Sequence, residues 1–114
     1  MSLTVSTRTQ GDVTILVLQG RVTLGPDNVT LSNALQDAVA KNVRKLLLNM
    51  AGVTHMDTSG ISSLVRGFVG LQRSGGRLAL VAMPERIRMV LDMTRLLNVI
   101  PVFSDEAAAL AGLK

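Results

Sequence analysis

The sequence predicts a single α/β domain over residues 1–114, in which about four helices pack on a mixed β-sheet of about four to five strands. Three observations support this fold class. The chain is long enough to bury one hydrophobic core and too short for two. Short apolar runs alternate with stretches whose apolar residues recur at helical spacing. Hydrophobic residues form 47% of the chain but aromatic residues only 2%, so the core is aliphatic, which suits helices packed on a sheet.

The N-terminal part is predicted to form a β-hairpin and then a helix. Residues 3–8 alternate well enough to pair with residues 13–18 across a turn at residues 10–12. Gly25-Pro26-Asp27 combines a turn with residues that typically begin a helix. Apolar residues at helical spacing then predict a first helix over residues 27–41: Leu31, Leu35, Ala38 and Val39.

The central part is predicted to form a β-α-β unit with a right-handed crossover. Residues 45–50 and 77–83 are short apolar runs of the kind that lie centrally in a sheet. A short turn is expected after the first of these strands. An apolar stripe then predicts a second helix that ends at Ser74-Gly75-Gly76, and its members are Ile61, Leu64, Val65, Phe68 and Leu71.

The C-terminal part is predicted to add two helices and a short strand. Pro84 begins a third helix with apolar residues on one face: Ile87, Val90 and Leu91. Residues 99–103 form the strand. Ser104 is expected to cap a final helix that runs through Leu110.

The composition excludes several classes of protein. The chain has no cysteine and a single histidine, so disulfides, metal sites and metal-dependent catalysis are not expected. No apolar run approaches the roughly 20 residues that a membrane span requires, so no transmembrane segment is expected. The N-terminus lacks the regions of a signal peptide, and a cytoplasmic location is therefore expected.

The basic character does not indicate binding to nucleic acid. The net charge is +4, but the basic residues form no run and the chain has no Tyr or Trp to stack on bases. Arg86, Arg88 and Arg95 are interspersed with acidic residues and are interpreted as a solvated helix face. No glycine-rich nucleotide-binding motif is present, so no cofactor is expected.

The most informative segment is Asp57-Thr58-Ser59-Gly60, which opens the second helix. Asp, Thr and Ser are good helix N-caps, so the segment could simply be a well-capped helix start. The alternative is a phosphorylation switch, because a helix N-terminus accommodates a phosphate. Two details favour the switch: hydroxyls continue at Ser62 and Ser63, and Gly60 costs helix stability while it opens the backbone to a partner.

No catalytic residue is assigned. His55 has no correctly ordered partners for a triad, and a lone histidine at a strand end is more often a half-buried spacer. We therefore expect a binding protein and not an enzyme. A flavodoxin-like enzyme has only the alternation of strands and helices in its favour.

Nearly the whole chain, from Leu3 to Leu110, resembles a STAS domain of the anti-sigma factor antagonist family. The Asp-Thr-Ser-Gly element at residues 57–60, directly after the apolar strand, is the most specific part of the resemblance. The chain departs from the family at residues 21–23, where an acidic residue is frequent, and at His55, where an apolar or aromatic residue is usual.

The resemblance implies a mechanism. The second hydroxyl residue of the motif is phosphorylated in the family, and Ser59 occupies that position here. The unphosphorylated protein would bind an anti-sigma factor with serine-kinase activity and free a sigma factor, and a PP2C-type phosphatase would reverse the modification. The setting would be bacterial transcription regulation in a stress-response or sporulation-like pathway. The remaining motif residues are assigned to the phosphosite and to partner contact: Asp57, Thr58, Gly60, Ser62 and Ser63.

Other expectations concern the alternatives and the shape of the site. A structural STAS subunit of a stress-sensing scaffold or of a lipid-transport ABC system is the alternative function, and a weak homodimer is left open. The apolar stripe should face the sheet and leave Ser59, Ser62 and Ser63 on a side free for docking, and residues 21–24 could form the other wall of that docking surface. Asp57 should cap the helix, so Asp57→Asn should cost little stability and Asp57→Ala about 0.5–2 kcal/mol.

Overall fold

A computed structural model describes residues 3–95 and 99–113. It confirms the α/β fold class, with five strands and four helices among the described residues. The elements in chain order are β1 (Thr4–Gln10), β2 (Val13–Val22), α1 (Pro26–Ala40), β3 (Lys45–Met56), α2 (Thr58–Arg73), β4 (Arg77–Val81), α3 (Glu85–Met93), β5 (Val102–Phe103) and α4 (Glu106–Gly112).

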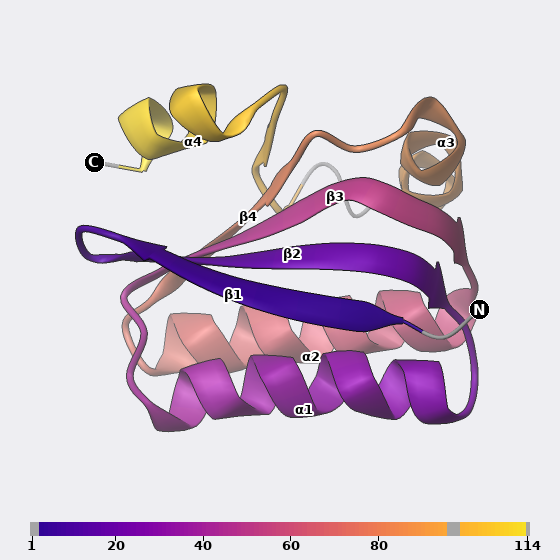
Figure 1. Ribbon diagram of the computed structural model, residues 1–114, viewed down its shortest axis with the longest axis horizontal. Helices are drawn as coiled ribbons and strands as arrows, with labels where there is room; N and C mark the ends of the chain where they lie inside the picture. Colours follow the sequence, from indigo (N-terminus) through magenta and orange to yellow (C-terminus); the bar gives the residue numbers. More distant parts are fainter. Residues whose placement is uncertain (1–2, 96–98, 114) are drawn as a thin grey trace.

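The sheet is mixed, with the strand order β1-β2-β3-β4-β5. β1 and β2 form the expected antiparallel hairpin, and the other neighbouring strands are parallel. Figure 1 shows α1 and α2 on one face of the sheet and α3 and α4 on the other. Both faces are therefore covered, which explains why the central strands are continuous apolar runs.

The core lies on both faces of the sheet. In β3, Leu46 and Leu48 belong to the larger cluster, which includes residues of α1 and α2, while Leu47 belongs to a smaller cluster with Ala109 of α4. All three leucines are fully buried. Burial of one leucine side chain contributes about 1.5–3 kcal/mol, so the helices are held mainly by aliphatic packing.

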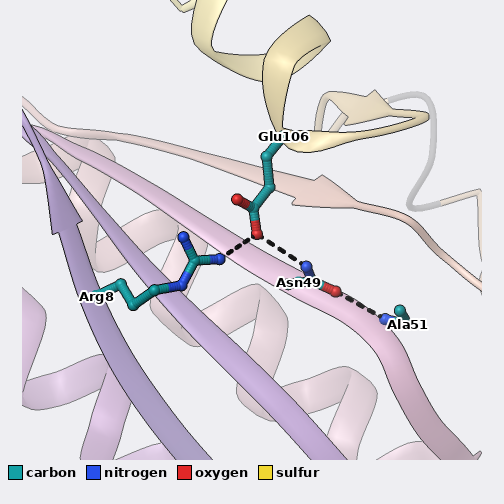
Figure 2. A network of polar contacts seen from close by, with 4 residues as sticks. All are labelled: Arg8, Asn49, Ala51 and Glu106. Carbon is teal, nitrogen blue, oxygen red and sulfur yellow. Dashed lines mark hydrogen bonds and ion pairs between the residues drawn. The ribbon is translucent and has the colours of Figure 1, made fainter.

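A polar network links the hairpin to the C-terminal helix on one face (Figure 2). The Arg8 guanidinium lies 2.6 Å from Oε2 of Glu106, and Nδ2 of Asn49 donates to the same oxygen at 2.9 Å. Asn49 also accepts from the Ala51 N–H at 3.0 Å. Glu106 thus joins β1, β3 and the first turn of α4.

Several expected element boundaries are wrong, and β4, for example, ends at Val81 and not at residue 83. No turn follows Met50, because β2 extends to Val22 and supplies hydrogen-bonding partners for β3 as far as Met56. β5 covers only Val102–Phe103. The cap of α4 is Asp105 instead of Ser104, because the Asp105 carboxylate accepts from the Ala108 N–H at 2.8 Å.

Candidate functional site

Asp57 organises the start of α2. Its Oδ1 accepts hydrogen bonds from the N–H groups of Ser59, at 3.0 Å, and Gly60, at 3.2 Å. The Ser59 hydroxyl donates to the same oxygen at 2.5 Å. These contacts satisfy two of the N–H groups that a helix start leaves without partners, and they confirm Asp57 as the N-cap.

Asp57 also holds the loop between β2 and α1. Its second carboxylate oxygen, Oδ2, accepts from the Leu24 N–H at 2.9 Å, and its own N–H donates to the Val22 carbonyl at 3.2 Å. These bonds join segments that are more than thirty positions apart in the chain. This connection could not be predicted from the sequence, since nothing local marks Leu24 as a partner of Asp57.

The hydrogen bonds keep the Asp57 carboxyl ionised. The Ser59 hydroxyl contributes most to lowering the pKa of Asp57, and the N–H groups of Leu24, Gly60 and Ser59 lower it further against the opposing effect of desolvation. An ionised acceptor with a lowered pKa is a weak base. The hydrogen bonds that Asp57 accepts orient the turn that carries Ser59.

The hydroxyl residues of the first turns differ in accessibility. Thr58 and Ser62 are exposed, and they lie one helical turn apart. Ser59 is half-buried, and its hydroxyl is held against Asp57. These three residues form the accessible part of the predicted site.

The expectation that Ser63 faces a free docking side is wrong. Ser63 is only 1% exposed, and its hydroxyl donates to the Asn28 side chain of α1. Nη2 of Arg66 donates to Ser63 Oγ at 3.3 Å. Because α1 packs beside α2, this hydroxyl joins the two helices. A substitution such as Ser63→Arg would therefore disturb packing as well as any interface.

The expectation that Gly60 opens the backbone to a partner is also wrong. Gly60 is buried, and a Cβ placed on it would lie 2.7 Å from Cγ1 of Val22 and 2.9 Å from the Val22 carbonyl oxygen. Glycine is required because the first turn of α2 lies directly on the end of β2. The small size of Gly60 therefore allows α2 to pack closely against β2.

Gly60→Ala is expected to lower the free energy of unfolding by about 1–2 kcal/mol in urea melts. Overpacking typically costs about 1–3 kcal/mol, and alanine returns up to about 1 kcal/mol through its better helix propensity. The Val22 carbonyl cannot move away easily, since it accepts the Asp57 N–H. Ser62→Ala, at an exposed position of the same helix, is the control and should be nearly neutral. A Gly60→Ala variant at least as stable as the parent would contradict this packing argument.

A groove of about 330 Å³ lies beside Asp57. The sequence suggested residues 21–24 as a wall of the docking surface, but it did not predict that α3 forms part of this groove. Three basic side chains line it: Arg21 at the end of β2, His55 at the end of β3 and Arg86 in the first turn of α3. Arg86 is exposed, in accord with the predicted solvated face, but it also borders this groove. The register pairs Arg21 with His55, which a sequence pattern alone does not reveal.

Within residues 3–95 and 99–113, no three His, Cys, Asp or Glu side chains cluster in a way that could hold a metal ion. In the described part of the chain, no helix has both the length and the apolar character needed to span a membrane.

Comparison with known proteins gives matches along nearly the whole chain. Residues 4–109 match the STAS domain family. The fold is similar to an anti-sigma factor antagonist from Mycobacterium paratuberculosis, with a TM-score of 0.89, 20% identity and coverage of 98% of this chain and 94% of that one. It is also similar to the Bacillus cell fate determinant SpoIIAA in its phosphorylated form, with a TM-score of 0.74, 15% identity and coverage of 97% and 100%.

A further similar structure is a sulfate transporter family protein from Wolinella succinogenes, with a TM-score of 0.74, 18% identity and coverage of 90% of this chain and 84% of that one. At these identities the structural likeness establishes the fold. The family match, in contrast, extends from the first strand into the last helix. The chain belongs to the STAS domain family.

Proposed function

We propose that the protein is an anti-sigma factor antagonist whose binding is controlled by phosphorylation of Ser59. The observation that carries this proposal is the position of the Ser59 hydroxyl. It lies in the first turn of α2, outside the hydrophobic core, at the end of the helix where a negative charge is favourable. The similarity to SpoIIAA, which has been solved in a phosphorylated form, supports the proposal.

The proposed cycle has two states. The unphosphorylated protein binds an anti-sigma factor with serine-kinase activity, and a sigma factor is released. That kinase transfers the γ-phosphoryl group of ATP to Oγ of Ser59, whose proton is lost, and a PP2C-type phosphatase hydrolyses the ester. The protein is then a substrate of these enzymes and has no catalytic residue of its own.

The other residues of the motif have different parts in this proposal. Thr58 and Ser62 are exposed and contact the partner, and Asp57 orients the turn through its hydrogen bonds. Gly60 and Ser63 are buried, so they contribute by fixing α2 against β2 and α1.

Phosphorylation is expected at Ser59 when the protein is incubated with ATP and the kinase-type anti-sigma factors of its source organism. The site is mapped by mass spectrometry. Ser59→Ala should remain folded and take up no phosphate, while Ser104→Ala, at an exposed position just before α4, should be modified like the parent protein. Modification confined to Thr58 or Ser62 would refute the assignment of Ser59.

A structural subunit of a larger assembly, such as a transport system or a stress-sensing scaffold, is the second candidate function. The similarity to the sulfate transporter family protein favours it. Neighbouring genes distinguish the two candidates. An adjacent gene for a kinase-type anti-sigma factor supports the antagonist, and adjacent transport genes support the subunit.

A further inference from the structure

The groove beside Asp57 combines an apolar floor with a basic rim. Met56 and Ile87 line it and are only 8% and 1% exposed, and half-buried Val90 lies next to them. Arg21 and Arg86 are exposed at its border. Figure 1 shows α3 beside the ends of β2 and β3 at which α2 begins, so the groove adjoins the turn of Ser59.

The positive charge of the groove is neutralised only in part by the described residues. The ion pairs among the described residues join Arg8 to Glu106, Lys41 to Asp37 and Lys45 to Asp12, and none of these residues lines the groove. Asp57 is the one carboxylate among the lining residues, and both of its oxygens already accept bonds from Leu24, Ser59 and Gly60. The groove therefore presents an excess of cationic groups.

Apolar side chains continue the surface beyond the groove. Arg86, Val90 and Met93 follow one another at helical spacing on one side of α3, and Met93 is 86% exposed. On the side of Asp57, Leu24 is 78% exposed. Exposed large apolar side chains next to an apolar groove are typical of a protein-binding surface.

We propose that this groove receives an acidic amphipathic segment of the anti-sigma factor. Carboxylates of the segment pair with Arg21 and Arg86, and its apolar side chains pack on Met56, Ile87 and Val90. The inference rests on the proposed function and specifies the chemistry of its partner. A nucleic acid fits less well, because no Phe, Tyr or Trp is among the described residues that line the groove. A small anion would leave the apolar floor and Met93 uncovered.

The test measures the affinity of the unphosphorylated protein for kinase-type anti-sigma factors of the source organism by isothermal titration calorimetry. Arg21→Glu and Arg86→Glu should each weaken binding by at least about tenfold, with no change in melting temperature, because both side chains are exposed. Arg44→Glu is the matched control, since Arg44 is exposed and precedes β3, at the opposite end of that strand. It should change affinity by less than about twofold.

The outcomes separate this inference from the proposed function. Loss of binding on phosphorylation of Ser59, with full affinity in both groove variants, would overturn the inference and leave the function standing. Weaker binding in the groove variants, without an effect of phosphorylation, would support the groove as the binding site and refute control of binding by phosphorylation of Ser59. Absence of binding to every such anti-sigma factor would refute both. Replacement of acidic residues of the partner segment by lysine should restore the affinity of Arg86→Glu.

A small anion as the natural occupant is tested separately by NMR with inorganic phosphate as the probe. Shifts confined to the residues of the groove, together with full anti-sigma factor affinity in Arg21→Glu and Arg86→Glu, would assign the groove to an anion and overturn the inference.

Discussion

Phosphorylation of Ser59 is expected to weaken binding of the anti-sigma factor by at least about 100-fold while the domain stays folded. A phosphate at a helix N-terminus gains about 0.3–1 kcal/mol from the dipole, which offsets part of its repulsion from Asp57, so the domain is expected to stay folded. The same group carries nearly two negative charges, and burial of such a charge without a partner in an interface costs several kcal/mol. A loss of about 1.4 kcal/mol already corresponds to a factor of ten in affinity.

The contacts of Ser59 strengthen this expectation. Its hydroxyl donates to Asp57 at 2.5 Å, and a phosphate ester on Oγ has no proton to donate. The phosphate and the ionised Asp57 carboxylate then repel each other and compete for the same N–H groups. The phosphate must therefore turn outward, onto the surface that carries Thr58 and Ser62.

Calorimetry on the phosphorylated and unphosphorylated proteins measures the affinity, and thermal melts measure the fold. Ser59→Ala is the control. It removes the hydroxyl that accepts the phosphate without adding charge, so it should retain most of the affinity for the anti-sigma factor. Equal affinities for the two forms would contradict the switch. A phosphorylated protein that has unfolded would show instead that the phosphate acts on stability.

The sequence predicted the site where one local pattern determined the structure. The N-cap role of Asp57 follows from residue type at a helix start, and the helix from the spacing of its apolar residues. The hairpin and the parallel crossover were likewise predictable, because the apolar runs set the strands and short turns or helices set their connections.

The sequence failed where distant segments meet. Helical spacing indicated which side of α2 faces the sheet, but it could not indicate that α1 covers Ser63 through Asn28. Gly60 gave no sign of its contact with Val22, since that contact depends on where β2 ends. The basic groove is made by β2, β3 and α3, which only the sheet topology brings together.

Asp57→Ala and Asp57→Asn are both expected to lower the free energy of unfolding, and the loss should be larger for Asp57→Ala. Asp57→Ala removes the acceptor of the Ser59 and Gly60 N–H groups, of the Ser59 hydroxyl and of the Leu24 N–H. Loss of a cap costs about 0.5–2 kcal/mol, and loss of the solvent-exposed hydrogen bond from the Leu24 N–H adds about 0.5–1.5 kcal/mol. We therefore expect a loss of about 1–3.5 kcal/mol for Asp57→Ala.

Asp57→Asn is expected to cost more than the small loss of stability that the sequence suggested. The amide oxygen can replace Oδ1 at Ser59 and Gly60, but the amide NH₂ then faces the Leu24 N–H, and two donors meet. An unsatisfied donor costs about 1–3 kcal/mol, less where water reaches it, so a loss of about 1 kcal/mol is expected. Asp37→Asn is the control, because Asp37 is exposed and pairs only with Lys41 among the ion pairs of the described chain.

The pH dependence identifies the contribution of the charge. The pKa of Asp57 is lowered in the folded state, so its stabilisation is present above the unfolded pKa of about 3.9 and is lost as the pH falls through the folded value. In urea melts, the parent should therefore exceed Asp57→Asn at neutral pH, and the difference should shrink below about pH 5. Equal stability of the parent and Asp57→Asn at neutral pH would show that the hydrogen bond from Leu24 to Asp57 does not contribute to stability. A difference that persists unchanged at about pH 2 would show that it does not depend on the charge of Asp57.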